Sequence, residues 1–147
     1  MDRGKAGSKI HVLSDAAGLP LATAVSAANT HDKHALRPLF LAIPPIRSRR
    51  GPRRRKPAKA RADKGYDFDD LRGWLRGRGI VPRIARRGIE SSERLGRHRY
   101  KIERTIAWLF GYRRLTIRYE RYGHLFTAFL TLAATITCYK KLARLTT

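Results

Sequence analysis

The sequence predicts an α/β fold, with a mixed sheet and flanking helices. Three patterns support this class: apolar and polar residues alternate near the start, a strand, a helix and a strand succeed each other at mid-chain, and apolar residues recur at helical spacing near the end. The 147 residues, 42% of them hydrophobic, suffice for one ordinary core. We therefore expect a single domain over residues 1–147.

The first elements should form a hairpin. Ile10 and Val12 alternate with polar neighbours in a strand over residues 9–13, turn-forming residues occupy 15–18, and a second strand runs over 19–28. Because the sheet begins so early, any preceding strand would have to come from elsewhere. We expect the chain to be the later part of a larger domain.

A short helix should follow the hairpin. Asp32 is placed to cap its start, and Pro44–Pro45 should end it. His31 and His34 lie at its beginning, but no acid or Cys stands at a useful spacing from them. Capping or hydrogen bonding is therefore favoured over metal binding.

Residues 46–59 are predicted to form a basic, disordered loop. The segment is rich in Pro, Gly and Arg and has no apolar periodicity. It is either a solvated linker or a segment that contacts phosphates without reading sequence. The basicity of the whole chain favours phosphate contacts, which we assign to Arg47, Arg49, Arg50, Arg53, Arg54, Arg55 and Lys56.

A strand, a helix and a second strand should come next. The first strand ends at Asp63, the helix opens with Asp67 as its N-cap, and the second strand covers residues 80–85. This order predicts a βαβ unit and places Asp63 at the carboxyl end of a strand. Ligands and catalytic groups gather at that edge in α/β sheets.

Two helices should complete the core. The first runs from about Arg99 to Phe110 and presents Arg99 and Glu103 on one face, where they could form a simple salt bridge. The second runs from about His124 to Leu145. The basic segment between them is interleaved with Tyr, a composition that suits phosphate contacts and stacking. Its candidate DNA contacts are Arg113, Arg114, Arg118 and Arg121.

Charge and cysteine content indicate which class of partner the chain binds and in which compartment it is found. Lys and Arg number 33 against 11 acids, a formal net charge of +22, so a polyanion is the expected partner. Nucleic acid comes first, and an anionic membrane surface second. The longest apolar segment, 125–139, is too short to span a bilayer. A lone Cys138 in an apolar segment and a polar N-terminus predict a buried, reduced thiol and a cytoplasmic protein.

Two carboxylates stand apart from the others, because Asp63 and Glu103 lie in strongly basic surroundings. Asp15 has the position of a turn residue, Asp69–Asp70 complement a helix dipole, and Glu120 has the features of a surface charge. Two-metal phosphoryl transfer requires acids that hold a pair of Mg²⁺ ions. By spacing alone, however, a capping Asp and an ion-paired Glu are the favoured interpretation.

Three blocks of sequence favour the metal-binding interpretation instead. They are DRGKAGSKIHVLSDAAGLPLATAVSAANTHD, ADKGYD and RYKIERTIAWLFGYRRLTIRYER, and they occur in this order over nearly the whole chain. In all three, the chain resembles the C-terminal half of a DDE-type transposase of bacterial insertion sequences, from the insertion sequence four/five superfamily. The resemblance implies an RNase H-like fold, here incomplete at the N-terminus because the first catalytic strand is missing.

The resemblance also implies roles for single residues. Asp63 matches the second metal-binding Asp, Glu103 the catalytic Glu, and Arg99 the Arg of a Tyr, Arg, Glu, Lys signature. Gly96 and Phe110 stand where that signature has its Tyr and Lys. The nearest replacements are Tyr100 and either Arg113 or Arg114.

No residue of this chain matches the first Asp of the family. We therefore expect two of three metal-binding acids, a truncated or downstream-frame product, and weak or absent catalysis by this chain alone. For the complete enzyme the resemblance implies phosphodiester hydrolysis and strand transfer with Mg²⁺ or Mn²⁺. It further implies DNA partners at the element ends and target, a homodimer in the synaptic complex, no membrane, and the bacterial nucleoid as location. The alternative is a non-catalytic DNA- or RNA-binding protein or a regulatory remnant.

Overall fold

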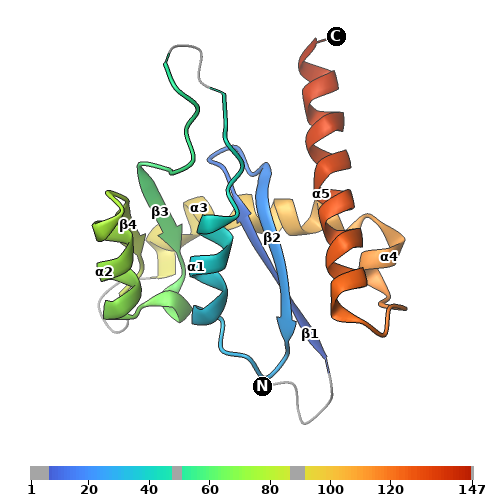
Figure 1. Ribbon diagram of the computed structural model, residues 1–147, viewed down its shortest axis with the longest axis horizontal. Coiled ribbons are helices and arrows are strands. Elements are labelled where there is room, and N and C mark those ends of the chain that lie inside the picture. The colour runs from blue at the N-terminus through green and yellow to red at the C-terminus, as the bar shows by residue number, and fades with distance from the viewer. Residues whose placement is uncertain (1–6, 48–50, 87–91, 147) are drawn as a thin grey trace. The chain divides into compact units, whose positions relative to one another are not determined.

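The computed structural model describes residues 7–47, 51–86 and 92–146, with the backbone alone for 92–99 and 146. It confirms the mixed α/β class. In chain order the elements are β1 (Ser8–Ser14), β2 (Pro20–Ala27), α1 (Lys33–Leu41), β3 (Lys59–Ala62), the 3₁₀ helix η1 (Lys64–Tyr66), α2 (Asp69–Gly77), β4 (Val81–Ile84), α3 (Ser92–Phe110), α4 (Arg113–Thr116) and α5 (Gly123–Thr146) (Figure 1).

The chain forms two compact units. Residues 1–30 and 98–147 make the hairpin unit, and residues 31–97 make the βαβ unit. The prediction of one catalytic domain over residues 1–147 stays a prediction, because it concerns how the two units join.

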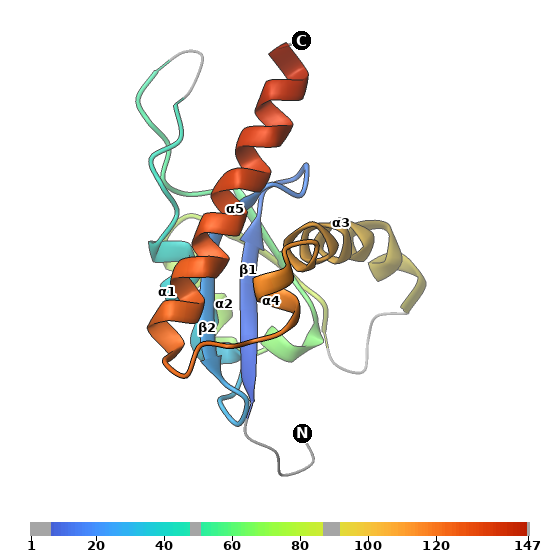
Figure 2. The ribbon, with the colours of Figure 1, turned by 90° about the vertical axis from the view of Figure 1, so that its right-hand side faces the viewer.

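The hairpin unit contains the predicted antiparallel pair of β1 and β2. Ser8 pairs with Ala27 and Leu13 with Ala22, and the register shifts at Ser14. Helix α5 runs along β2 in this unit (Figure 2). The apolar core lies between helices and hairpin and consists of Leu109, Leu115, Phe126, Leu130, Ala133 and Ala134, with Ile10, Val12 and Val25 packed against them.

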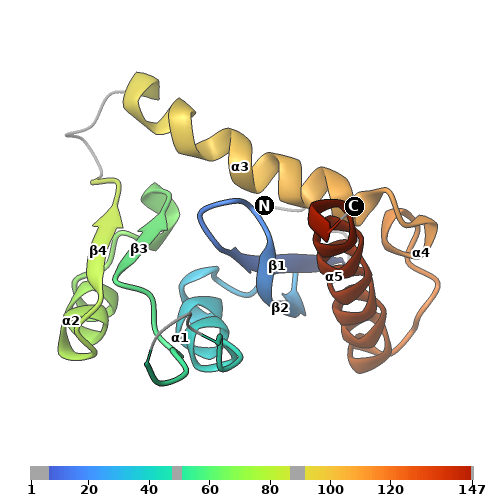
Figure 3. The same ribbon diagram turned by 90° about the horizontal axis from the view of Figure 1, so that it is seen from above.

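The βαβ unit also follows the prediction. Strands β3 and β4 are parallel, with Lys59 opposite Val81 and Ala62 opposite Ile84, and α2 connects them (Figure 3). A parallel pair requires such a crossover, because its strands run in the same direction. The core of this unit consists of Leu36, Ala60, Leu71, Leu75, Ile80 and Ile84.

Helix ends account for the main differences from the predicted elements. Phe68, not Asp67, occupies the N-cap position of α2. Asp67 was wrongly predicted as the cap because its carboxylate is taken by an ion pair with Arg72. Asp32 does occupy the N-cap position of α1, but it makes no side-chain cap hydrogen bond.

The basic segments also differ in part from expectation. Helix α3 begins at Ser92, before the predicted start near Arg99, and α4 is a short helix inside the tyrosine-rich basic segment. In the 46–59 loop, Ile46 and Arg54 form an isolated antiparallel bridge. Disorder of this loop stays a prediction.

The apolar helix α5 is not a membrane span. Within the described part of the chain, no helix combines the length and the hydropathy needed to cross a bilayer. Cys138 on α5 is half-buried, and its Sγ lies 3.5 Å from the carbonyl oxygen of Pro20. Burial raises the pKa of this thiol, with a smaller contribution from the charge of Asp15, so the thiolate is disfavoured.

Two leucines on α5 test how the hairpin unit is held together. Leu130 is 0% exposed and Leu132 is 54% exposed. We expect Leu130→Ala to lower the free energy of unfolding by about 2–5 kcal/mol, because it leaves a cavity in the core. Leu132→Ala, two residues away, should change it by less than about 0.5 kcal/mol. Chemical denaturation measures both, and equal effects would contradict the packing of α5.

Candidate functional site

Asp63 is presented where β3 ends. Its backbone remains extended, and its Oδ1 accepts a hydrogen bond from the Gly65 amide at 2.9 Å, which caps η1. The side chain is exposed to solvent. Apart from this cap, the Asp63 side chain makes no other hydrogen bond or ion pair to the described residues, while the Asp63 carbonyl oxygen accepts from the Tyr66 amide. One carboxylate oxygen therefore fixes the rotamer while the other remains available to a ligand.

A buried arginine, Arg72, links the segment after Asp63 to the neighbouring strand β4. Arg72 is 7% exposed, and its Nε and Nη2 donate to Asp67 Oδ1 at 2.8 and 2.6 Å. The same Nη2 donates to the carbonyl oxygen of Ile84 at 2.9 Å. Ile84 ends β4 and is the register partner of Ala62, the residue before Asp63. We call this set of contacts the Arg72 bridge. It ties the carboxyl end of β4, which pairs with the end of β3, to Asp67 in the segment that follows Asp63.

The pKa of Tyr66 reflects burial and the negative charges near Asp63. Burial raises the pKa of its phenol to about 12, with further contributions from the negative charges of Asp32 and Asp63. Both carboxylates disfavour a further negative charge on Tyr66. A bound cation would be favoured there for the same reason.

In the hairpin unit, α3 is fastened to the turn between β1 and β2. The basic and hydroxyl side chains of Lys101, Arg104 and Thr105 donate to consecutive carbonyl oxygens of that turn. The distances are 2.7 Å to Ala16, 2.8 Å to Ala17 and 2.5 Å to Gly18, in the same order. We call these three bonds the α3–turn contact.

Glu103 lies between Lys101 and Arg104 in the sequence of α3 and is exposed. The helix that carries it can approach the turn closely only because Gly18 has no side chain. Gly18 has a φ of +87°, and a Cβ there would lie 3.1 Å from Thr105 Oγ1 and 3.3 Å from the Lys101 carbonyl oxygen. The turn itself is closed by Asp15, whose Oδ1 accepts from the amides of Ala17 and Leu19. Its predicted role as a turn residue is confirmed.

The structure places the two acids in different units, Asp63 in the βαβ unit and Glu103 in the hairpin unit. No cluster of three or more His, Cys, Asp or Glu side chains suited to a metal occurs among the described residues. Carboxylate oxygens are nevertheless the ligands that Mg²⁺ prefers, and both acids are exposed enough to take one. Arg99 lies four residues before Glu103 on α3, and its side chain lies outside the described part.

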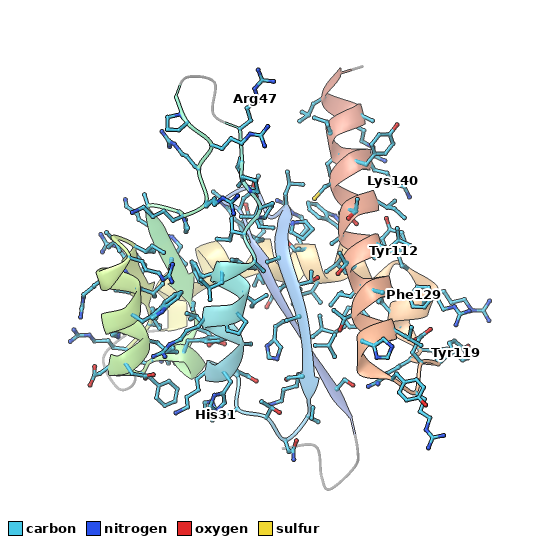
Figure 4. All side chains as sticks on the ribbon, viewed as in Figure 1. His31, Arg47, Tyr112, Tyr119, Phe129 and Lys140 are labelled. Atoms are coloured by element: carbon cyan, nitrogen blue, oxygen red, sulfur yellow. The ribbon has the colours of Figure 1, made fainter. Side chains whose placement is uncertain are left out.

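The 46–59 loop offers its cations to solvent. Arg47 points outward (Figure 4), and the described residues Arg53, Arg54 and Arg55 are exposed as well. Lys56 is exposed too, although its Nζ donates to the carbonyl oxygen of Arg78 at 3.1 Å. Arg49 and Arg50 lie outside the described residues.

The second basic segment divides its arginines between two tasks. Arg113 and Arg121 are exposed. Arg114 and Arg118 are exposed as well. Arg114 also stacks on Tyr119 and Phe129, two rings labelled in Figure 4. Arg118 stacks on the Phe126 ring (5.3 Å) and donates to backbone carbonyl oxygens of the same segment. Two of the four predicted DNA contacts therefore also stabilise the fold.

Glu120 corrects a prediction. It was expected to be a surface charge, yet its side chain is 6% exposed and its Oε1 accepts from Arg114 Nη1 at 3.1 Å. The partners are six residues apart and not on one helix, so no local spacing rule indicates the pair. The basic composition of the segment gave no indication that Glu120 is buried.

Comparison with known proteins identifies the family of this chain. Residues 1–138 match the family described as Transposase DDE domain. Over 143 residues, the chain is 46% identical to a protein of Burkholderia cepacia named "Putative transposase for insertion sequence element IS402", and the match covers 97% of this chain and 68% of that protein. No solved structure matches the chain.

Gly18 tests the α3–turn contact. We expect Gly18→Ala to lower the free energy of unfolding by about 1–3 kcal/mol, because the residue has a positive φ and its new Cβ would press on Thr105. Gly73→Ala is the matched control: Gly73 lies inside α2 with open space around it, so Ala there should be neutral or slightly stabilising. Urea unfolding compares the two, and a Gly18→Ala chain as stable as the parent would disprove the close approach.

Arg72 tests the bridge in the βαβ unit. Arg72→Met should lower stability by about 3–5 kcal/mol, because it removes the guanidinium that pairs with the largely buried Asp67 carboxylate. Arg76→Met on the same helix removes an exposed charge and should cost under about 1 kcal/mol. Thermal and chemical unfolding provide the measurement. Similar losses in both variants would mean that the bridge contributes nothing beyond a surface charge.

Proposed function

Since the chain belongs to the family of DDE-domain transposases and serves insertion-sequence transposition, we propose that Asp63 and Glu103 are two of its catalytic, metal-binding acids. The observation that carries this proposal is the position of Asp63. It leaves the carboxyl end of a parallel strand, where α/β sheets gather their catalytic groups, and it is held by one oxygen only. Glu103, exposed on α3, is the second acid.

The family works with divalent metal ions, and we propose Mg²⁺, or Mn²⁺ in its place, for this chain. Two such ions, when bound, would activate the attacking oxygen and neutralise the leaving one in phosphodiester chemistry. The chain's own part is to hold Asp63 through the η1 cap and Glu103 through α3. Arg99, four residues before Glu103, is assigned to orienting that acid or neutralising phosphate. No residue here matches the family's first Asp, so we propose that a further segment supplies it and that these 147 residues alone are inactive.

An RNase H-like sheet is the architecture we propose for the complete catalytic domain. An antiparallel hairpin followed along the chain by a parallel βαβ unit is consistent with that fold. Each two-stranded sheet is small for independent stability, because strands gain most from pairing on both edges. In this proposal, the strand that carries the first Asp completes the sheet.

The basic segments are proposed to bind the DNA backbone. Arg113, Arg121 and the exposed cations of the 46–59 loop fit phosphates, since Arg offers planar, paired donors. The DNA partners are the element ends and the target, bound by a homodimer at the bacterial nucleoid. A non-catalytic DNA- or RNA-binding protein remains the second candidate. The high positive charge favours it, and so does the match to only two of the family's three metal-binding acids. Both functions imply strongly salt-dependent binding, so affinity does not separate them.

Acid substitutions separate the two functions. In a transposition-competent protein that contains these residues, Asp63→Asn and Glu103→Gln should each reduce strand transfer with Mg²⁺ by a hundredfold or more, on the order of the several kcal/mol that a metal supplies. Binding to DNA should persist, because both changes remove negative charge. Asp69→Asn, at an exposed acid in the first turn of α2, is the control and should retain activity.

The readout is strand transfer into plasmid DNA alongside a gel-shift measurement of binding. Full transfer by either acid variant would overturn the catalytic assignment and leave the binding function. Loss of binding together with transfer would point to misfolding, which circular dichroism detects.

A further inference from the structure

The hairpin unit contains a pocket of about 830 Å³ between β1, the end of α3 and the segment around Arg118. Its volume lies within the roughly 300–1,000 Å³ typical of ligand sites. Most of its wall is apolar, and aromatic rings contribute to it. The apolar lining residues are Ile10, Ile106, Phe110, Leu115 and Phe126.

Glu120 is the acid that lines this pocket. Its Oε1 is paired with Arg114, but its Oε2 is buried without a hydrogen-bond partner among the described residues. A buried carboxylate oxygen is strongly disfavoured unless a donor satisfies it, so an orphan of this kind calls for an explanation. A ligand that brings an N–H donor into the pocket would supply the missing partner.

The rim of the pocket is of opposite character. Arg118 and Arg121 line it, and Tyr119, which is 57% exposed, presents a ring for stacking. The pocket thus joins an apolar interior, a buried acceptor and cations that suit phosphate. A base attached to a DNA backbone has the matching parts: a flat ring, a polar edge and a phosphate.

We propose that this pocket receives an unpaired guanine of the DNA substrate, and the inference rests on the proposed function in taking DNA as the ligand. Guanine places two donors, N1–H and the 2-amino group, side by side on its Watson–Crick edge. A carboxylate is acceptor-only and matches them. Adenine and cytosine place a ring-nitrogen acceptor beside their amino group, and thymine flanks its one donor with carbonyl oxygens, so all three would face Glu120 with a repelling lone pair.

The base reaches Glu120 by turning the rim side chains outward. The Oε2 atom is covered in the free protein, and Tyr119 and Arg121 are the exposed side chains beside it. Tyr119 then stacks on the guanine, while Arg121 binds the adjoining phosphate. Arg114 continues to hold Oε1, so the carboxylate keeps its orientation.

A series of duplexes tests the ligand without changing the protein. Each duplex carries one unpaired base at its centre: guanine, inosine, adenine, cytosine or thymine. Inosine differs from guanine only by lacking the 2-amino group. Fluorescence anisotropy with the 147-residue chain should show guanine bound about five- to tenfold more tightly than inosine, as expected for one lost hydrogen bond in a discriminating contact. Equal affinity for guanine and inosine overturns the proposal.

Protein variants locate the preference. Glu120→Gln should abolish the guanine preference and leave the affinity for fully paired duplex within about twofold. Asp69→Asn changes the net charge by the same amount and should keep the preference. Ile106→Trp places a larger side chain at the pocket wall and leaves both members of the Arg114–Glu120 pair unchanged, so it should also remove the preference if Glu120→Gln proves unstable. A guanine preference that survives in a folded Glu120→Gln or Ile106→Trp chain places the site elsewhere and contradicts the proposal.

The same data distinguish this inference from the function on which it rests. If the chain binds paired and unpaired DNA alike, only the guanine pocket is wrong. If it binds no DNA at low salt, the DNA ligand itself is wrong, and the proposed function fails with it.

Discussion

The Arg72 bridge is the contact on which the geometry around Asp63 depends. Strands β3 and β4 have only four residues each, so their ladder alone holds the strand ends weakly. A buried guanidinium that binds both Asp67 and the last carbonyl of β4 adds directional, charge-assisted bonds at that point. Catalytic constellations tolerate misplacement of about 0.5 Å. For the proposed role of Asp63 as a metal ligand, this positioning would come in part from Arg72, a buried residue.

The hairpin unit reaches a similar result with backbone acceptors. Lys101 and Arg104 flank Glu103 in sequence, yet each donates to a carbonyl oxygen of the β1–β2 turn. Each of these cations therefore helps to hold α3 against the turn. This arrangement also explains why Gly18 is required, since the turn must present its carbonyls at close range. In both units, positive charge that the composition assigns to DNA also serves to build the protein.

Periodicity was sufficient for the framework but not for the buried charges. Alternation at Ile10 and Val12 predicted β1, and the order of patterns at mid-chain predicted the βαβ unit with Asp63 at a strand end. Arg72 and Glu120 escaped prediction because neither has its charged partner on the same helix. A burial pattern records apolar residues, and a basic segment makes an internal acid look solvated. Only tertiary contacts reveal that these charges face inward.

Acids in so basic a chain have a distinct physical meaning. A net charge of +22 attracts every phosphate alike, so it supplies affinity and on-rate without discrimination. Discrimination requires groups that some ligands cannot satisfy, because specificity is a difference between affinities. A carboxylate repels phosphate and ring acceptors and accepts only donors. In the proposed pocket, Glu120 has one paired and one unpaired carboxylate oxygen, so it would disfavour ligands that present an acceptor, even though the arginines attract their phosphates.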